Sequence, residues 1–279
     1  MAELQTTTNE MTMAELHKTL GINDKSQSGS ATRLPELKIS SQRKDKEGND
    51  IRKFEGQFYL KNYEHEVYAK TVKVRVLSQL FQWIDYDPDE NRVRNKTLLI
   101  PFFSHEARDM QGGIRCGKPT SREMKDWSPE QKSKYSTITL FRQLRCLVSY
   151  TGVTASGEEI VVENVPSIIL NKNSSYMNFE NEVVKKMGGR NYSDVWVDLV
   201  SQEQVNGSVT YYTWHYSPDI KNPVALDDKT METMVHFASL VKSENQRVDS
   251  SYESSLKSRV IDDDALEALE DDLDADLRD

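Results

Sequence analysis

The feature that most limits the possible folds is a strand-like alternation of apolar and polar side chains through the middle of the chain. Val72, Val74 and Val76 alternate with polar or larger neighbours, and a period of two is typical of a half-buried strand. Asn206-Gly207 gives a strong hairpin signal, followed by a return strand over 209–216. The sequence therefore predicts a mainly β (α+β) fold. We expect further strands over 36–42, 54–62, 78–86, 96–103, 136–150, 159–170 and 193–201.

Helices are fewer. Helical spacing predicts one over 175–187, ended by Gly188-Gly189, and another over 227–242. A short helix over 11–22 is either part of a loose terminus or an arm that docks on a neighbour. We divide the chain into a flexible N-terminal arm (1–32), a β-rich core (33–242), a polar linker (243–261) and an acidic tail (262–279).

The net charge of −9 lies entirely in that tail, where ten side chains are acidic and one is basic. The first 261 residues are neutral, and within them residues 33–150 have a net charge of +7. A block of like charge at a terminus is usually an interaction tail. The low isoelectric point therefore hides a basic core region.

Leucines recur in the tail at spacings of 3, 4 and 4, which is an amphipathic helical pattern. An isolated helix this short is marginal in water, so we expect it to fold on a partner; the alternative is a solubilising tail. The residues proposed for this role are Asp262, Asp263, Asp264, Leu266, Leu269, Leu273 and Leu277.

The sequence gives little support for a membrane protein, a secreted protein or an enzyme. The longest apolar run is short, and the N-terminus lacks a basic-then-apolar signal pattern, so we expect a cytoplasmic protein. Cys116 and Cys146 fit a reducing environment. The histidines are scattered, no phosphate-binding or nucleophile motif occurs, and the acidic run at 85–90 lacks the glycine of a calcium loop. We predict a non-enzyme without metal or cofactor, with a turn at 85–91.

Strand parity supplies candidate nucleic-acid contacts, because cations follow a phosphate backbone and aromatic faces stack on bases. If no bulge interrupts the strands, one face is apolar and the other mixes cations with aromatics. Packing in a second core is the alternative for these aromatics. The candidates are Lys73, Arg75, Phe81, Trp83, Arg115, Lys118, Phe141 and Arg145.

Two of these candidates lie in the glycine-rich segment 112–119. Glycines let backbone N–H groups approach an anion, and Arg115 and Lys118 would contact a phosphodiester there. The alternative is a flexible connection whose charges keep it solvated.

A β-rich core with a basic region, joined to an extreme acidic C-terminus, resembles the single-stranded DNA-binding proteins of tailed bacteriophages. The segments 34–40, 112–118 and 164–166 also look like those of a recurrent phage protein. The resemblance implies an OB-like, partly open β-barrel with one or two peripheral helices. It also implies a tail that competes with DNA and recruits replication or recombination proteins. The chain ends without the aromatic of many such tails, and it has no zinc-ligand set.

We therefore expect a protein that binds single-stranded DNA in replication, recombination or repair, in the host cytoplasm if viral, with possible self-association. One alternative is a virion-associated or scaffolding protein that docks through its acidic tail and does not bind DNA. Another is a nuclease with Asp85 and Asp87 on a metal.

Overall fold

The computed structural model describes residues 34–41, 51–207 and 209–276, with side chains described up to residue 256. Contacts divide the chain into Met1–Leu34 and Pro35–Asp279. The second unit contains every strand and helix that is described. The predicted N-terminal arm and the helix over 11–22 lie outside the described residues.

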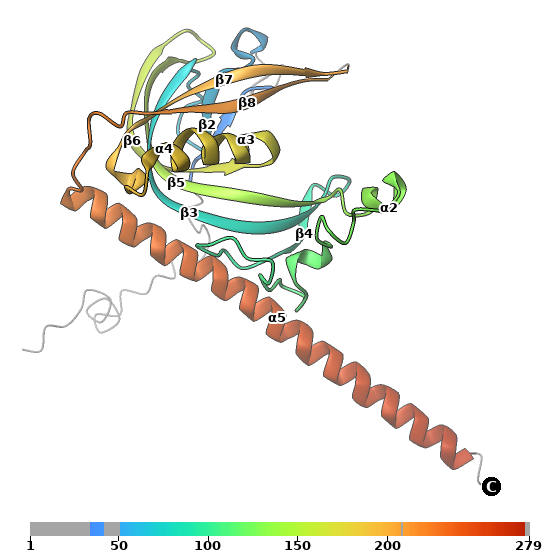
Figure 1. Cartoon of the computed structure of the whole chain (residues 1–279). Coiled ribbons are helices and arrows are strands. Elements are labelled where there is room, and N and C mark those ends of the chain that lie inside the picture. Colours follow the sequence, from blue (N-terminus) through green and yellow to red (C-terminus); the bar gives the residue numbers. More distant parts are fainter. Residues whose placement is uncertain (1–33, 42–50, 208, 277–279) are drawn as a thin grey trace, which may run out of the picture. The chain divides into compact units, whose positions relative to one another are not determined.

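The second unit is mostly β, as predicted, and its strands form one curled sheet (Figure 1). The strands are β1 (Glu36–Ile39), β2 (Phe58–Lys61), β3 (Thr71–Asp87), β4 (Arg92–Lys96), β5 (Ile138–Val153), β6 (Glu159–Asn171), β7 (Val197–Asn206) and β8 (Val209–Pro218). Their order is β2-β1-β6-β5-β3-β7-β8, with β4 paired to β3. The predicted hairpin is confirmed, since β7 and β8 meet at the Asn206–Val209 pair.

Pairings between distant strands produce the curl. β1 is parallel to β6 and antiparallel to β2. Phe58 of β2 then bridges Ala69, just before β3, and Tyr68 bridges Val153 at the end of β5. A side chain at Gly152 would place its Cβ 2.4 Å from the Tyr68 carbonyl oxygen. Glycine therefore permits the close approach at this junction.

A helical stretch lies inside the curl (Figure 1) and contributes to the main core. It consists of α3 (Asn173–Phe179), the π-helical turn η4 (Glu180–Val184) and α4 (Lys185–Met187). Phe179, Val183 and Met187 are buried with the valines of β3. Gly188 ends the stretch in the left-handed region, at φ 59°. The helix predicted over 175–187 is confirmed.

The same stretch satisfies the free edge of β8. The Trp214 amide donates to the hydroxyl of Ser175 (3.3 Å) and the Tyr216 amide donates to the Glu182 carboxylate (2.7 Å), while Asn178 donates to the Trp214 carbonyl (2.8 Å). Edge strands with unpaired backbone groups invite association with other chains. Side chains of α3 and η4 remove that liability along this part of β8.

The helix predicted over 227–242 is much longer, because α5 runs from Asp228 to Asp276 (Figure 1). The Asp227 carboxylate accepts from the Thr230 amide (2.8 Å) and so caps the first turn. The expected linker at 243–261 is wrong, since these residues are helical. Some of their polar side chains attach α5 to the rest of the unit, because Glu244 accepts from Arg145 and Asn245 forms hydrogen bonds with the backbone of Leu99.

The connection from β4 to β5 differs from expectation. The strand predicted over 96–103 is wrong, because β4 ends at Lys96 and the chain then becomes irregular. The helix α2 (Pro129–Ser133) was not predicted, although Ser128 and Gln131 form a capping box there. Short 3-10 turns occupy Arg52–Phe54 (η2), Arg115–Gly117 (η3) and Tyr192–Asp194 (η5). None of the described helices is long and apolar enough to cross a membrane.

Candidate nucleic-acid interface

A β-bulge divides the mixed face that strand parity predicts. The register of β3 against β5 shifts between Val76 and Ser78, and one extra residue moves all later side chains to the opposite face. Lys73 and Arg75 therefore lie on the other side of the sheet from Phe81 and Trp83. The prediction of one face carrying all four is wrong.

Two predicted contact residues are buried arginines with partners inside the protein. Arg75 donates to the backbone carbonyls of Ser193, Val224 and Ala225 at 2.8–3.0 Å. Arg145 is 0% exposed and pairs with Glu244 of α5 at 2.7 Å. Both arginines fix other elements to the sheet, and neither is open to a phosphate.

The other strand candidates differ in exposure. Lys73 is exposed, with its ammonium 4.0 Å from the Asp198 carboxylate. Phe81 is buried, whereas Trp83 and Phe141 are half-buried. The exposed Lys172 places its ammonium 6.0 Å from the Phe141 ring centroid. Lys73, Trp83 and Phe141 thus remain accessible candidates.

The glycine-rich segment binds an anion, but the anion belongs to the protein. The buried carboxylate of Asp109 accepts from the backbone amides of Gln111 (2.9 Å) and Gly113 (3.0 Å). Arg115 is mostly buried, 3.8 Å from Glu123. Lys118 donates to the Ile138 carbonyl, and burial lowers the pKa of its ammonium. The segment is therefore folded around its own carboxylate.

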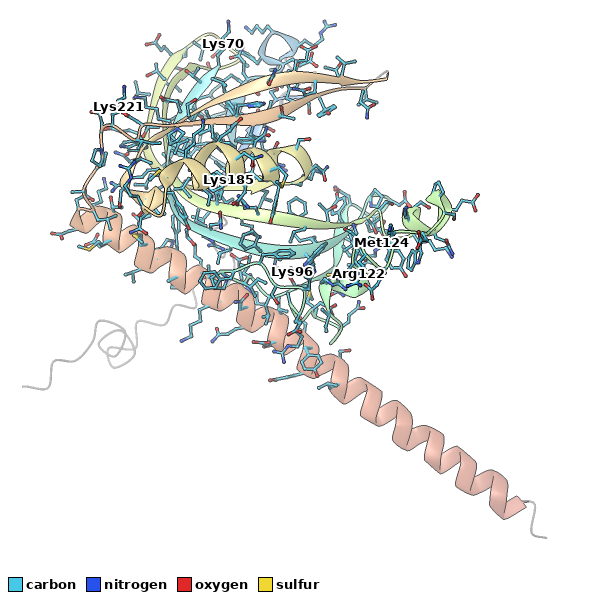
Figure 2. The ribbon with its side chains drawn as sticks, viewed as in Figure 1. Lys70, Lys96, Arg122, Met124, Lys185 and Lys221 are labelled. Atoms are coloured by element: carbon cyan, nitrogen blue, oxygen red, sulfur yellow. The ribbon has the colours of Figure 1, made fainter. Side chains whose placement is uncertain are left out.

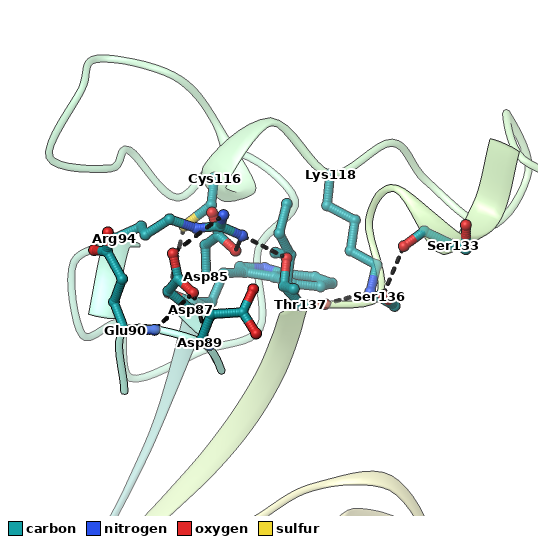
Figure 3. A network of polar contacts seen from close by, with 12 residues as sticks. Asp85, Asp87, Asp89, Glu90, Arg94, Cys116, Lys118, Ser133, Ser136 and Thr137 are labelled. Carbon is teal, nitrogen blue, oxygen red and sulfur yellow. Dashed lines mark hydrogen bonds and ion pairs between the residues drawn. The ribbon is translucent and has the colours of Figure 1, made fainter. Parts of the chain in front are cut away.

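A polar network joins this segment to the ends of β3 and β4 (Figure 3). Arg94 pairs with Asp85 (3.0 Å) and Asp87 (3.6 Å), and it also donates to Thr137 (3.1 Å). Burial raises the pKa of the Cys116 thiol to about 12, so this thiol is protonated at neutral pH. Both carboxylates of the nuclease alternative pair with the same guanidinium, that of Arg94. Among the described residues, no cluster of three or more potential ligands is arranged for a metal ion.

Four exposed cations lie within residues 118–135, which we call the basic segment, together with the exposed carboxylates of Glu123, Asp126 and Glu130. Arg122, which Figure 2 labels, lies in it. The other exposed cations of the segment are Lys125, Lys132 and Lys134. Between them, the half-buried rings of Trp127 and Tyr135 lie 5.7 Å apart. The segment therefore combines exposed cations with an aromatic pair.

Lys118 is the one residue of this segment that the sequence predicted as a nucleic-acid contact. The available signal was the interleaving of Lys125, Trp127, Lys132, Lys134 and Tyr135. A search that required strand parity excluded it, because the segment consists of turns and the short helix α2.

Comparisons of the chain with protein-family models, with curated proteins and with solved structures return no match.

Proposed function

We propose that the protein binds single-stranded DNA and acts in DNA replication, recombination or repair. The observation that carries the proposal is the basic segment, with its four exposed cations around the Trp127–Tyr135 ring pair. Single-strand binding without strong sequence preference combines cations that follow the backbone with aromatic faces that stack on bases. Phe141 with Lys172, and Lys73, are further candidate contacts.

The curled sheet supports an OB-like, partly open barrel as the scaffold. β1, β6, β5 and β3 lie side by side, and β2 connects β1 to the residues before β3. In this proposal the barrel itself supplies few contacts, because Arg75 and Arg145 are internal. The β4–β5 connection presents the binding groups instead.

The acidic end of α5 is proposed to compete with DNA and to recruit replication proteins. Residues 262–279 have a net charge of −9, and the helix continues through this region to Asp276. A polyanionic segment competes electrostatically with phosphates for the exposed cations. The leucine spacing would then offer one apolar stripe to a protein groove.

The test is a titration of oligothymidylate into the protein, followed by tryptophan fluorescence at several salt concentrations. Each phosphate contact contributes about −0.7 to the slope of log K against log salt for single strands. Lys132→Gln/Lys134→Gln should therefore reduce the slope by about 1.4. The matched control is Lys70→Gln/Lys221→Gln, because both lysines are exposed and lie far from the basic segment (Figure 2).

The length of α5 favours a second candidate, a docking protein that does not bind DNA. A helix of 49 residues ending in a strongly acidic stretch is suited to a basic groove on a partner protein. Absence of fluorescence quenching by oligothymidylate at low salt, with residues 262–279 removed, would favour this candidate over DNA binding.

A further inference from the structure

We propose that an aromatic patch beside α3, separate from the basic segment, is a stacking site for unpaired nucleobases. The aromatic patch consists of Phe102, Phe103, His105 and Tyr176. This inference rests on the proposed function and extends it, because a site that takes unstacked bases selects single strands over duplex DNA.

The aromatic patch is recognised by the solvent exposure of its two phenylalanines. Phe102 is 81% exposed and Phe103 is 44% exposed, and two adjacent exposed phenylalanines are unusual for a turn that has no partner. The Phe103 ring is nearly perpendicular to the Phe81 ring (6.2 Å, 79°) and to the His105 ring (4.7 Å, 81°). These edge contacts hold Phe103 in one orientation and leave part of its surface in solvent.

The interior supports the patch from below. Phe81 is buried, and its ring lies 6.1 Å from that of Tyr176 on α3. The guanidinium of Arg142 lies 4.3 Å from the Tyr176 ring centroid and 5.5 Å from that of Phe81. Because Phe81 and Arg142 are opposite each other in the β3–β5 register, the sheet fixes both groups under the exposed rings.

Arg142 stabilises the aromatic cluster from within. It is 2% exposed and pairs with Glu180 through Nη2 at 2.7 Å, but its Nε and Nη1 atoms are buried without a hydrogen-bond partner. The guanidinium faces the rings of Tyr176, Phe81 and Phe179, at 4.3, 5.5 and 5.4 Å from their centroids, so this cation stabilises the aromatic cluster beneath the exposed rings. Nucleobases have flat π-faces that stack on an aromatic surface held in this way.

The position of the patch agrees with a strand that also contacts the basic segment. Phe81 and Asp85 are four residues apart on β3, which is roughly 13 Å at the usual strand rise. Lys118, at the start of the basic segment, contacts the Ile138 carbonyl, and Cys116, just before the segment, contacts the Trp83 carbonyl. Ile138 pairs with Asp85. Lys172, just before α3, adds an exposed cation near the patch. A single-stranded DNA segment of a few nucleotides would span this distance along β3.

The experiment compares two polymers of equal length, oligothymidylate and an abasic deoxyribose-phosphate oligomer. Both carry the backbone charge, but only the first has bases. Phe102→Ala/Phe103→Ala should weaken oligothymidylate binding by about 5- to 150-fold, the effect of one lost stack, and should leave abasic binding unchanged. Phe103→Trp should retain the preference for oligothymidylate. Circular dichroism establishes that each variant is folded.

Tyr211→Ala is the matched control, since Tyr211 is an aromatic of similar exposure (41%) on β8. The proposal is overturned if Tyr211→Ala has the same effect, if both polymers lose affinity equally in the phenylalanine variant, or if only self-association changes. If the wild-type protein binds the two polymers equally, the stacking site is wrong and DNA binding stands. If it binds neither polymer, the proposed function is wrong as well.

Discussion

The ion pair between Arg145 and Glu244 is expected to give unequal costs when its two partners are removed separately. Arg145 is fully buried, and two of its nitrogens, Nε and Nη1, already lack partners. The Glu244 side chain is 34% exposed. Removing the carboxylate leaves a buried charge without compensation, whereas removing the arginine leaves a carboxylate that water can reach.

We therefore expect Glu244→Ala to lower the free energy of unfolding by about 3 kcal/mol, at the low end for a broken buried pair because Glu244 is partly solvated. Arg145→Met should cost only about 1 kcal/mol, since methionine replaces the apolar stem and no charge is stranded. The double variant Arg145→Met/Glu244→Ala should be more stable than Glu244→Ala alone. Such a reversal is possible only if the stranded cation causes the loss.

Urea unfolding followed by far-ultraviolet circular dichroism measures these differences, because α5 is the longest described helix. Amide hydrogen exchange along 228–256 shows whether α5 opens locally. The control is Asp249→Ala, which breaks an exposed pair with Arg108 and should cost at most about 1 kcal/mol. A larger cost for Arg145→Met than for Glu244→Ala, or strictly additive costs, would refute this account of the docking.

Three further predictions concern the tail, the start of α5 and the curl of the sheet. Removal of residues 262–279 should tighten oligothymidylate binding at low salt and have little effect at high salt, as measured by fluorescence titration. Hydrogen bonds from the Thr230 side chain and backbone lower the pKa of Asp227 from its ordinary 3.8. The stabilisation that the Asp227 carboxylate gives to the fold is therefore complete above pH 3.8 and is lost as the pH falls through the lower pKa of the folded state. Asp227→Asn should remove this pH dependence from an acid titration followed by circular dichroism at 222 nm. Gly152→Ala should destabilise the fold by about 1–3 kcal/mol in urea unfolding, because the new Cβ meets the Tyr68 carbonyl.

Local patterns predicted most of the strands and helices. The alternation of Val72, Val74 and Val76 and the Asn206-Gly207 turn gave β3 and the β7–β8 hairpin. These signals depend on neighbours in sequence. The bulge after Val76 depends instead on how β3 meets β5, so the strand pattern alone did not reveal it. That single residue reversed the face assigned to Phe81 and Trp83.

Burial of charge was the other property that the sequence did not reveal. Arg75 and Arg145 are basic residues on strands, and composition alone makes them equivalent to an exposed cation such as Lys73. Their internal partners are Ser193, the backbone before α5, and Glu244, all of them more than 90 residues away in the chain. Hydrogen bonds and ion pairs to residues distant in the sequence thus distinguish the structural arginines from the candidate DNA contacts.

This separation changes where a polyanion can be bound. The net charge of +7 over residues 33–150 includes the arginines that hold α5 and the segment before it, so the charge is not a single surface. Four of the exposed cations lie instead in the basic segment, where Trp127 and Tyr135 lie among them. The aromatic patch lies beside the C-terminal half of β3, where the ring of Phe81 contacts that of Phe103. A strand that contacts both would be held through charge at one position and through base stacking at the other, so salt should weaken only the first contribution.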